Sequence, residues 1–499
     1  MVSPILFVVG PLAAAFLMIF INNRAVALAL SLATPALLAV LGLSWLPVVL
    51  QRAQPILVAS LSAPLGIPMS IDALAASMAI LVAVSATLVV LYSSSYMKGS
   101  HHEVRYYAVV MILLTSAFGF VLTRDLFNLF VFFEILCISS FILVSWEQNA
   151  PSLEASFKYM VLGAIGSTFL LVAIALSYRL AGRLDMAGIA QAYAGAPKAY
   201  TALAAALFLF GVGVEAAIFP VNTWLPDAHS SAPSSISAIL SGFVIELSLL
   251  VVFRVLNTVF GAVDMLPVLM VVAIIGVVVG EFSAYAQKDL KRMLAYSSVS
   301  QIGIMLFAFS IGTPESAQAG LQHLLMHTGA KSALFLIAGY FIVRTGSRLV
   351  EDYVGLGRRM PVSAALFGLA ALSLVGAPPL FGFFTKLQIL QAAAGSGGAL
   401  AWAGIAIILL GTAVEAMYLF RVLRILFSTA HDAENAPENA TGAEATHTEM
   451  AGLTGPREIP LAPMTAIALF TALVVFGALL LPALSSMIGP IAEGLANLR

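Results

Sequence analysis

Charged residues and cysteine are scarce in this 499-residue sequence. Lys, Arg, Asp and Glu make up 9% of the chain, against about 25% in soluble domains, whereas apolar residues make up 61%. A chain of this composition cannot form a soluble surface, which excludes a soluble globular protein. Because Cys137 is the one cysteine, the chain cannot form an internal disulfide or supply the ligands of an iron–sulfur cluster.

Patterns that bind nucleotides or nucleic acids are also missing. The sequence contains no GxxxxGK[ST] phosphate loop and no GxGxxG turn that opens a helix. Its formal net charge of −1 argues against a nucleic-acid partner. We therefore predict a polytopic membrane protein without a cofactor or metal site of its own, driven by a partner or by an ion gradient.

Apolar runs of about 20 residues, long enough to span about 30 Å of hydrocarbon, recur along the whole chain. They predict an all-α integral membrane fold of about 14 transmembrane helices, at residues 2–21, 25–50, 70–97, 104–122, 126–146, 155–178, 199–221, 234–260, 264–286, 290–312, 316–344, 362–393, 400–428 and 460–487. Pro220 breaks the seventh helix, and Pro378 and Pro379 break the twelfth. Since an odd-numbered repeat inverts its second copy, breaks five helices apart predict two inverted five-helix repeats.

The predicted organisation has five parts: N-terminal helices at 1–103, a first repeat at 104–260, a second at 261–428, an acidic flexible loop at 429–459 and a C-terminal helix at 460–499. The loop holds His431 and His447, but their spacing does not suit a metal site, so we expect a solvated segment. Lys and Arg are more frequent in the loops after odd-numbered helices. By the positive-inside rule these loops are cytoplasmic, and both termini lie on the outer side of the cytoplasmic (inner) membrane.

Ionisable side chains inside the apolar helices are the main functional signal. Each costs roughly 2.5–3.5 kcal/mol at a helix centre, so each is a candidate functional residue. Glu215 and Glu246 flank a polar, proline-interrupted stretch, Phe219 to Gly242, which membranes tolerate only where protein shields it or it lines a wet cavity. Burial shifts carboxylates and lysines towards neutrality, so such groups can load and release protons. The complete set is Glu134, Lys158, Glu215, Glu246, His323, His327, Lys331, Lys386 and Glu415.

Four segments carry a resemblance to a known family: Trp224 to Gly242, Asp289 to Gly303, His323 to Gly339 and Gly376 to Lys386. They resemble the proton-conducting antiporter-like subunits of respiratory complex I, of Mrp Na⁺/H⁺ antiporters and of membrane-bound hydrogenases. The resemblance extends from about Asp72 to Arg424. It implies 14 helices with inverted repeats and broken helices 7 and 12. It also implies a multisubunit membrane complex, with further antiporter-like and small membrane subunits, whose redox or antiport module drives this subunit.

The resemblance also implies roles for individual residues. Glu134 matches the helix 5 glutamate, and Lys386 matches the helix 12 lysine or glutamate on the exit side. His323 and His327 match the helix 11 histidines that connect the two half-channels. Lys331 aligns with a polar position one turn further on. Asp227 and His229 match residues of the family's loop that follows the helix 7 break.

Three glutamates depart from the family pattern. Glu215 on helix 7 and Glu246 on helix 8 stand where the family usually has lysine, and Glu415 on helix 13 has no expected counterpart. The family's helix 5 glutamate pairs with the helix 7 lysine, whereas here Glu134 and Glu215 would face each other. Two such carboxylates are expected to share a proton, so an ion-pair gate cannot operate there.

The sequence therefore predicts a proton-translocating subunit. In it Glu134 and Glu215 form the input-side pair, Glu246 is the central relay, and Lys386, with Glu415 nearby, is the exit-side group. His323 and His327 bridge the halves, with Lys331 one turn further along.

Two alternatives stay open: a Na⁺-translocating subunit that uses clustered carboxylates, and a non-conducting scaffold of a membrane redox complex. The sequence has no haem, flavin or nicotinamide motif, which argues against a redox enzyme that acts on its own. A quinone contact at the subunit surface stays open. An inorganic-carbon-uptake complex would need a zinc-bearing partner.

Overall fold

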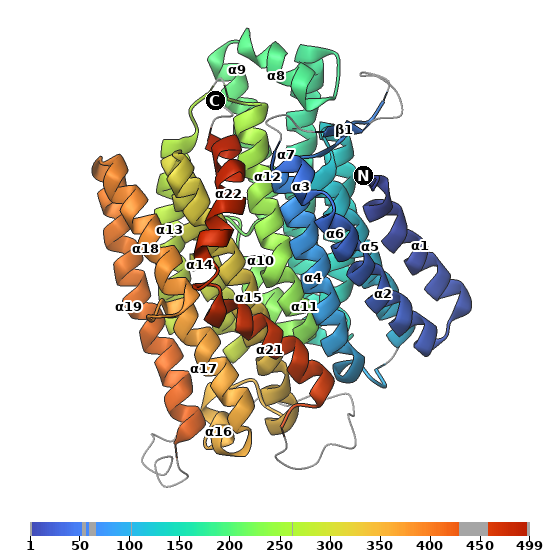
Figure 1. The fold of residues 1–499 in the computed structure, drawn as a ribbon, viewed down its shortest axis with the longest axis vertical. Helices are drawn as coiled ribbons and strands as arrows, with labels where there is room; N and C mark the ends of the chain where they lie inside the picture. Colours follow the sequence, from blue (N-terminus) through green and yellow to red (C-terminus); the bar gives the residue numbers. More distant parts are fainter. Residues whose placement is uncertain are drawn as a thin grey trace.

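The computed structural model of the chain describes residues 2–51, 56–58, 66–100, 102–261, 263–428 and 458–496. These residues form a tall bundle of helices (Figure 1). The acidic loop predicted at 429–459 lies outside the described residues except for its last two positions.

Helices dominate the fold. The first half contains α1 (Ile5–Ile21), α2 (Arg24–Leu43), α3 (Leu46–Val49), α4 (Ala73–Tyr96), α5 (Glu103–Leu122), α6 (Leu126–Val144), α7 (Ala150–Ala181), α8 (Met186–Ala194), α9 (Lys198–Glu215), α10 (Trp224–Ser231), α11 (Ser234–Ile239), the π-helix η1 (Leu240–Val244) and α12 (Ile245–Thr258). The second half contains α13 (Leu266–Tyr285), α14 (Leu290–Ile311), α15 (Pro314–Thr345), the 3₁₀ helix η2 (Val350–Tyr353), α16 (Leu356–Arg359), α17 (Pro361–Val375), α18 (Phe381–Ser396), α19 (Ala399–Phe427), α21 (Leu461–Phe476) and α22 (Leu481–Ala496). A short antiparallel pair, β1 (Ile56–Val58) and β2 (Met69–Ile71), was not predicted.

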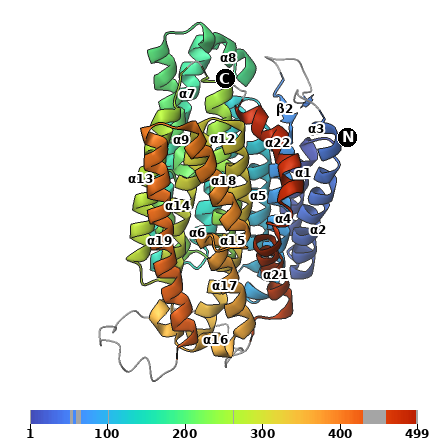
Figure 2. The same cartoon turned by 60° about the vertical axis from the view of Figure 1, so that its left-hand side comes forward.

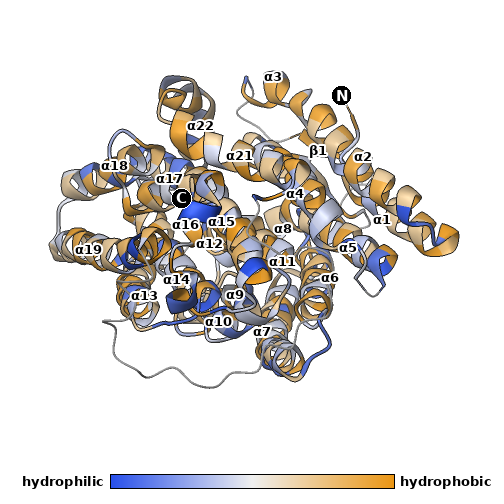
Figure 3. Cartoon of the chain, turned by 90° about the horizontal axis from the view of Figure 1, so that it is seen from below, coloured by the Kyte–Doolittle hydropathy of each residue, from blue (hydrophilic) through white to orange (hydrophobic). Residues whose placement is uncertain are grey.

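Eleven helices of the described part are long and apolar enough to cross a membrane, or twelve if the bent pair α21 and α22 is one span. The shorter apolar helices are α1 and α17. The stretch 460–487, predicted as one helix, bends by 88° between α21 and α22. Large apolar side chains are exposed on the outer helices, among them Phe20 on α1 and Trp402 on α19. Most helices carry many residues coloured as hydrophobic in Figure 3, as expected for a chain surrounded by lipid.

Both predicted breaks are present. Helix α9 ends at Glu215, and the Trp224 indole N–H donates to the Val214 carbonyl at 2.8 Å. That bond satisfies a carbonyl that the interrupted helix leaves without its usual partner. Helix α17 ends at Val375 and is capped by Gly376, whose φ of +90° is favourable only for glycine, and α18 begins at Phe381. The breaks therefore come directly beside Glu215 and a few residues before Lys386.

Several local features occur twice at equal spacing along the chain. Helices α7 and α15 both have 32 residues, a capping box at the start and a left-handed glycine at the end. The Leu126 N–H donates to the Leu184 carbonyl, and the Leu290 N–H donates to the Arg348 carbonyl, each at 3.0 Å. The first bond lies beside α8 and the second beside η2 and α16. Helices α8 and α16 lie at opposite ends of the bundle (Figures 1 and 2).

A cluster of charged side chains fixes the start of α4. Asp72 caps α4 through the Ala75 N–H at 2.7 Å and pairs with both Arg124 and Arg254. Burial alone would raise the pKa of Asp72, but the two guanidinium groups and the capping bond outweigh burial and hold it below its ordinary value. Arg254 also donates to the Val121 carbonyl at 2.7 Å.

Candidate functional site

Most of the predicted site residues are fully buried in the middle of the bundle. Glu215, Glu246, His323, His327, Lys331 and Glu415 are 0% exposed, and Lys386 is 5% exposed. Lys158 is different, because it is half exposed and pairs with Glu154 at 2.8 Å and Asp227 at 2.9 Å. Its helix begins at Ala150, earlier than predicted, and its side chain is not buried like those of the other predicted groups.

The first-half site is built around Glu215, the last residue of α9. The Tyr159 hydroxyl on α7 donates to Oε1 at 2.6 Å, and the Cys137 thiol on α6 lies 3.4 Å from Oε2. The Tyr159 ring stacks on Trp224 at a centroid distance of 3.7 Å, which fixes the hydroxyl beside the helix break. Among the described residues, no cationic side chain forms a hydrogen bond or ion pair with Glu215.

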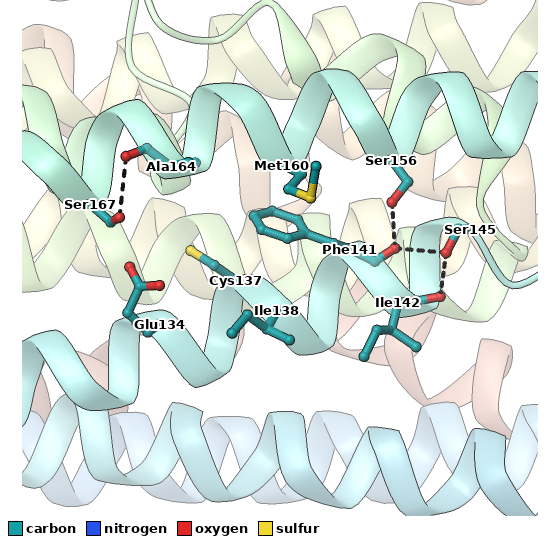
Figure 4. A pocket seen from close by; sticks show the side chains of 11 residues that line it. Glu134, Cys137, Ile138, Phe141, Ile142, Ser145, Ser156, Met160, Ala164 and Ser167 are labelled. Atoms are coloured by element: carbon teal, nitrogen blue, oxygen red, sulfur yellow. Dashed lines mark hydrogen bonds between the residues drawn. The ribbon is translucent and has the colours of Figure 1, made fainter.

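Glu134 lies one helical turn before Cys137, on the same side of α6. It lines an open pocket of about 390 Å³ between α6 and α7, into which Glu134 and Cys137 point (Figure 4). Its Oε1 is buried and has no hydrogen-bond partner among the described residues. Glu134 lies within electrostatic range of Glu215, but no hydrogen bond joins the two carboxylates. The direct proton-sharing contact predicted from the sequence is therefore not formed, because each carboxylate has its own surroundings.

Glu246 occupies the centre, on α12. Its Oε1 lies 2.5 Å from Nδ1 of His327, and its Oε2 accepts from the Thr328 hydroxyl at 2.6 Å. The π-helix η1 directly precedes this segment, and such an insertion changes the direction in which the following side chains point. Nε2 of His327 is buried and has no hydrogen-bond partner within the described part of the chain.

The second-half site is a network around Glu415 on α19. Nζ of Lys386 lies 2.8 Å from its Oε2, while Gln301 and Ser297 on α14 donate to Oε1 at 2.9 and 3.2 Å. The prediction that Glu415 lies near Lys386 is therefore confirmed as a direct ion pair.

Two further groups on α15 connect to this network. Nε2 of His323 lies 2.8 Å from Oε1 of Gln301, and its Nδ1 lies 2.9 Å from the Thr385 hydroxyl. Lys331 donates to Ser297 at 2.6 Å and to the Leu294 carbonyl at 3.0 Å. Because His323 and His327 lie one turn apart on α15, this helix links the Glu246 site to the Glu415 site.

Sequence reasoning missed several residues around these sites, among them Tyr159, Ser297, Gln301 and Glu281. Glu281 is 1% exposed on α13 and accepts from the Tyr418 hydroxyl at 3.1 Å. A search for charged residues within apolar runs would have found Glu281, because it lies inside the helix predicted at 264–286. Tyrosine, serine and glutamine are common in membrane helices and give no comparable signal.

Asp227 and His229, in the polar segment after the first helix break, lie apart from the buried series that runs from Glu215 to Lys386. Asp227 pairs with Lys158 and Arg292 at the end of the bundle. His229 is buried and stacks on Phe335 at 4.7 Å, and neither ring nitrogen has a hydrogen-bond partner among the described residues. Nowhere in the described part of the chain do three or more His, Cys, Asp or Glu residues converge as metal ligands.

A line of buried, hydrogen-bonded ionisable groups through a multi-pass helical bundle defines an antiporter-like membrane subunit. Residues 123–413 match the family described as "NADH:quinone oxidoreductase/Mrp antiporter, TM", so the chain belongs to that family. Residues 58–107 match "NADH-Ubiquinone oxidoreductase (complex I), chain 5 N-terminus".

Known proteins agree with this assignment. The chain is 33% identical over 367 residues to NADH-quinone oxidoreductase subunit N of Desulforudis audaxviator, covering 72% of each chain. A chain of the membrane-bound sulfane sulfur reductase, an archaeal respiratory membrane complex, superposes with a TM-score of 0.86 at 30% identity, covering 99% of this chain and 97% of that one. A chain of the Mrp complex from Dietzia sp. gives 0.87 at 25% identity, with the same coverage. Both structural neighbours are therefore parts of complexes.

Proposed function

We propose that this chain moves protons across the membrane within a multisubunit complex. The supporting observation is the buried series Glu246–His327, then His323–Gln301–Glu415–Lys386, whose hydrogen bonds lie between 2.5 and 2.9 Å. Carboxyl and imidazole groups can each accept and donate a proton, and a lysine side chain donates one as ammonium and accepts one as amine. Positioned groups of this kind speed proton transfer by about 10²–10⁴-fold.

Each residue has a role in this proposal. Glu134 and Glu215 receive protons on the input side, where the pocket beside Glu134 gives access between α6 and α7. Glu246 is the central relay, and His327 and His323 carry the proton along α15. Lys386, paired with Glu415, is the exit-side group, and Lys331 stabilises charge beside it. No hydrogen bond between described side chains joins Glu215 to Glu246, so transfer between them requires water or a side-chain movement.

The architecture we propose has 14 helices: N-terminal helices at 1–103, inverted repeats at 104–260 and 261–428, an acidic loop at 429–459 and a C-terminal helix at 460–499. Three features support the repeats: the paired 32-residue helices, the paired backbone bridges and the opposite positions of α8 and α16. Counting α1 and the broken helix α17–α18 as spans brings the number towards 14.

We further propose that the chain lies in the cytoplasmic (inner) membrane, with both termini on its outer side. In Figure 1, α1 begins and α22 ends towards the same end of the bundle.

Ion flux in sealed vesicles that contain the purified parent complex tests this function. With the complex running its own reaction, we expect proton transport in Na⁺-free medium and a loss of about 10²-fold in Glu246→Gln. The control is Glu154→Gln, an exposed glutamate on α7, which should transport at the wild-type rate. Strict Na⁺ dependence would favour cation translocation. Normal transport in Glu246→Gln would contradict the central relay and favour a scaffold.

A further inference from the structure

A second glutamate is buried beside the second-half site, and the proposed path does not use it. Glu281 on α13 accepts a hydrogen bond from Tyr418 on α19 at 3.1 Å. Gly411 on α19 provides the space, because a Cβ atom at this position would lie 3.2 Å from Cγ of Glu281. A buried carboxylate is costly, so its place here calls for a function.

Charged groups from three other helices surround Glu281. Glu415 on α19 and Lys386 on α18 lie within its electrostatic range, and Lys331 on α15 interacts with both carboxylates. Tyr418 lies within range of Glu281 and Glu415 and close to Ser297. Because the Ser297 hydroxyl donates to Glu415 at 3.2 Å, Tyr418 and Ser297 together connect the two glutamates.

The polar groups continue from this point to one face of the membrane. Glu415, Tyr418 and Arg421 are spaced by three residues, so they share one side of α19. Arg421 donates at 2.5 Å to the Gln287 carbonyl, in the turn directly after α13. Glu281 lies four residues before the end of α13, which is roughly 6 Å along the helix axis. Helices α13 and α19 lie side by side at one edge of the bundle (Figures 2 and 3), so the seam between them runs from Glu415 to the face that carries Lys288 and Arg421.

We propose that Glu281 and Tyr418 form a proton access path between this face and the Glu415–Lys386 pair. The inference rests on the proposed function, that the chain moves protons. Protonated Glu415 passes its proton through Ser297 to the Tyr418 oxygen, while the Tyr418 hydroxyl donates its own proton to the Glu281 carboxylate. Glu415 is left as a carboxylate and Glu281 becomes neutral, so protons and charge balance. The Glu415 carboxylate then pairs with Lys386 again.

The test measures proton flux through the whole complex in vesicles of one orientation, with the pH on each side set independently. We expect Glu281→Gln to lower the flux by roughly 10-fold or more and to abolish its dependence on pH at the Lys288 face, while dependence on the opposite face remains. Tyr418→Phe should give the same profile with a smaller loss, and the double variant should be no worse than Glu281→Gln. Gly411→Ala, which presses on Glu281 without removing an ionisable group, should lower the flux less.

Comparing Glu281→Gln with Tyr418→Phe and with Glu246→Gln separates failure of the access path from failure of assembly or of the proposed function. If Glu281→Gln does not assemble, Tyr418→Phe decides, because it removes one oxygen atom and leaves every charge in place. A wild-type rate and pH profile in either assembled variant would overturn the access path. If Glu246→Gln blocks flux while Glu281→Gln does not, this inference alone fails. If neither blocks flux, the proposed function fails with it.

Discussion

The two halves of the buried line hold their carboxylates in different ways. Glu215 in the first half is contacted by a phenol and a thiol, whereas Glu415 in the second half is contacted by an ammonium group, an amide and a hydroxyl. Cys137 and Gln301 occupy the same position in α6 and α14, and Tyr159 and His323 occupy the same position in α7 and α15.

Equivalent backbone positions therefore support two kinds of proton site. A buried carboxylate without a cation is stable mainly when it carries a proton, whereas an ion-paired carboxylate can remain charged. The first half is then suited to accept and hold a proton. The second half is suited to exchange a proton for the opening of an ion pair. In this chain the buried ion pair between lysine and glutamate lies in the second half, between Lys386 and Glu415.

The largest expected effect comes from breaking that pair in the second half. Lys386→Met leaves Glu415 buried without its counter-charge, so we expect a loss of about 3–5 kcal/mol in stability together with loss of proton flux. Thermal denaturation of the complex and vesicle flux measure the two effects. The double variant Lys386→Met/Glu415→Leu should recover stability without recovering flux. Wild-type stability in the single variant would show that the pair is not a buried ion pair.

Gln301→Leu cuts the link between His323 and Glu415. Both partners lose a buried hydrogen bond, so we expect a stability loss of about 1–3 kcal/mol. Flux should fall by about 10²-fold, because the relay is interrupted between the histidine and the carboxylate. Flux at the wild-type rate would exclude Gln301 from the path.

Tyr159→Phe examines the equivalent contact in the first half. The variant keeps the stacking on Trp224 and removes one hydrogen bond to Glu215, so stability should fall by about 1 kcal/mol. Flux should fall less than in Gln301→Leu, because Tyr159 supports the carboxylate and does not lie between two carriers. A larger loss of flux than in Gln301→Leu would mean that the first half also relays through its ring residue.

Cys137→Ser should have the smallest effect. A hydroxyl of similar size can donate to Glu215 in place of the thiol, so stability should change by no more than about 0.5 kcal/mol and flux should be nearly unchanged. The same assays check both values. A marked gain or loss of flux would show that the weak donor at this position tunes the first-half carboxylate.

Much of the fold could be predicted from apolar runs and proline positions. The breaks beside Glu215 and before Lys386 follow from Pro220 and from Pro378 and Pro379, because proline removes a backbone donor. The 88° bend in the last span lies between Gly477 and Pro482, a helix-boundary signal that the prediction of one helix at 460–487 did not use. The π-helix before Glu246 has no comparable local sequence signal.

The site was predicted in part. A charged residue in an apolar run identifies a buried group, but it does not identify the partner, which comes from another helix far away in sequence. Glu415 was predicted to lie near Lys386, but the ion pair between them was not predicted. The Glu246–His327 bond, at 2.5 Å, depends on how α12 and α15 pack and became visible only in the structure.

The most direct test of the contrast between the halves compares Glu215→Gln with Glu415→Gln. Both variants replace a carboxylate by an amide of the same shape, and both are measured for vesicle proton flux and for thermal stability of the complex. Both should lose flux, because each removes a proton carrier. Only Glu415→Gln should lose stability, because it leaves Lys386 without its counter-charge. Equal stability losses, or normal flux in either variant, would contradict a path with a neutral first site and an ion-paired second site.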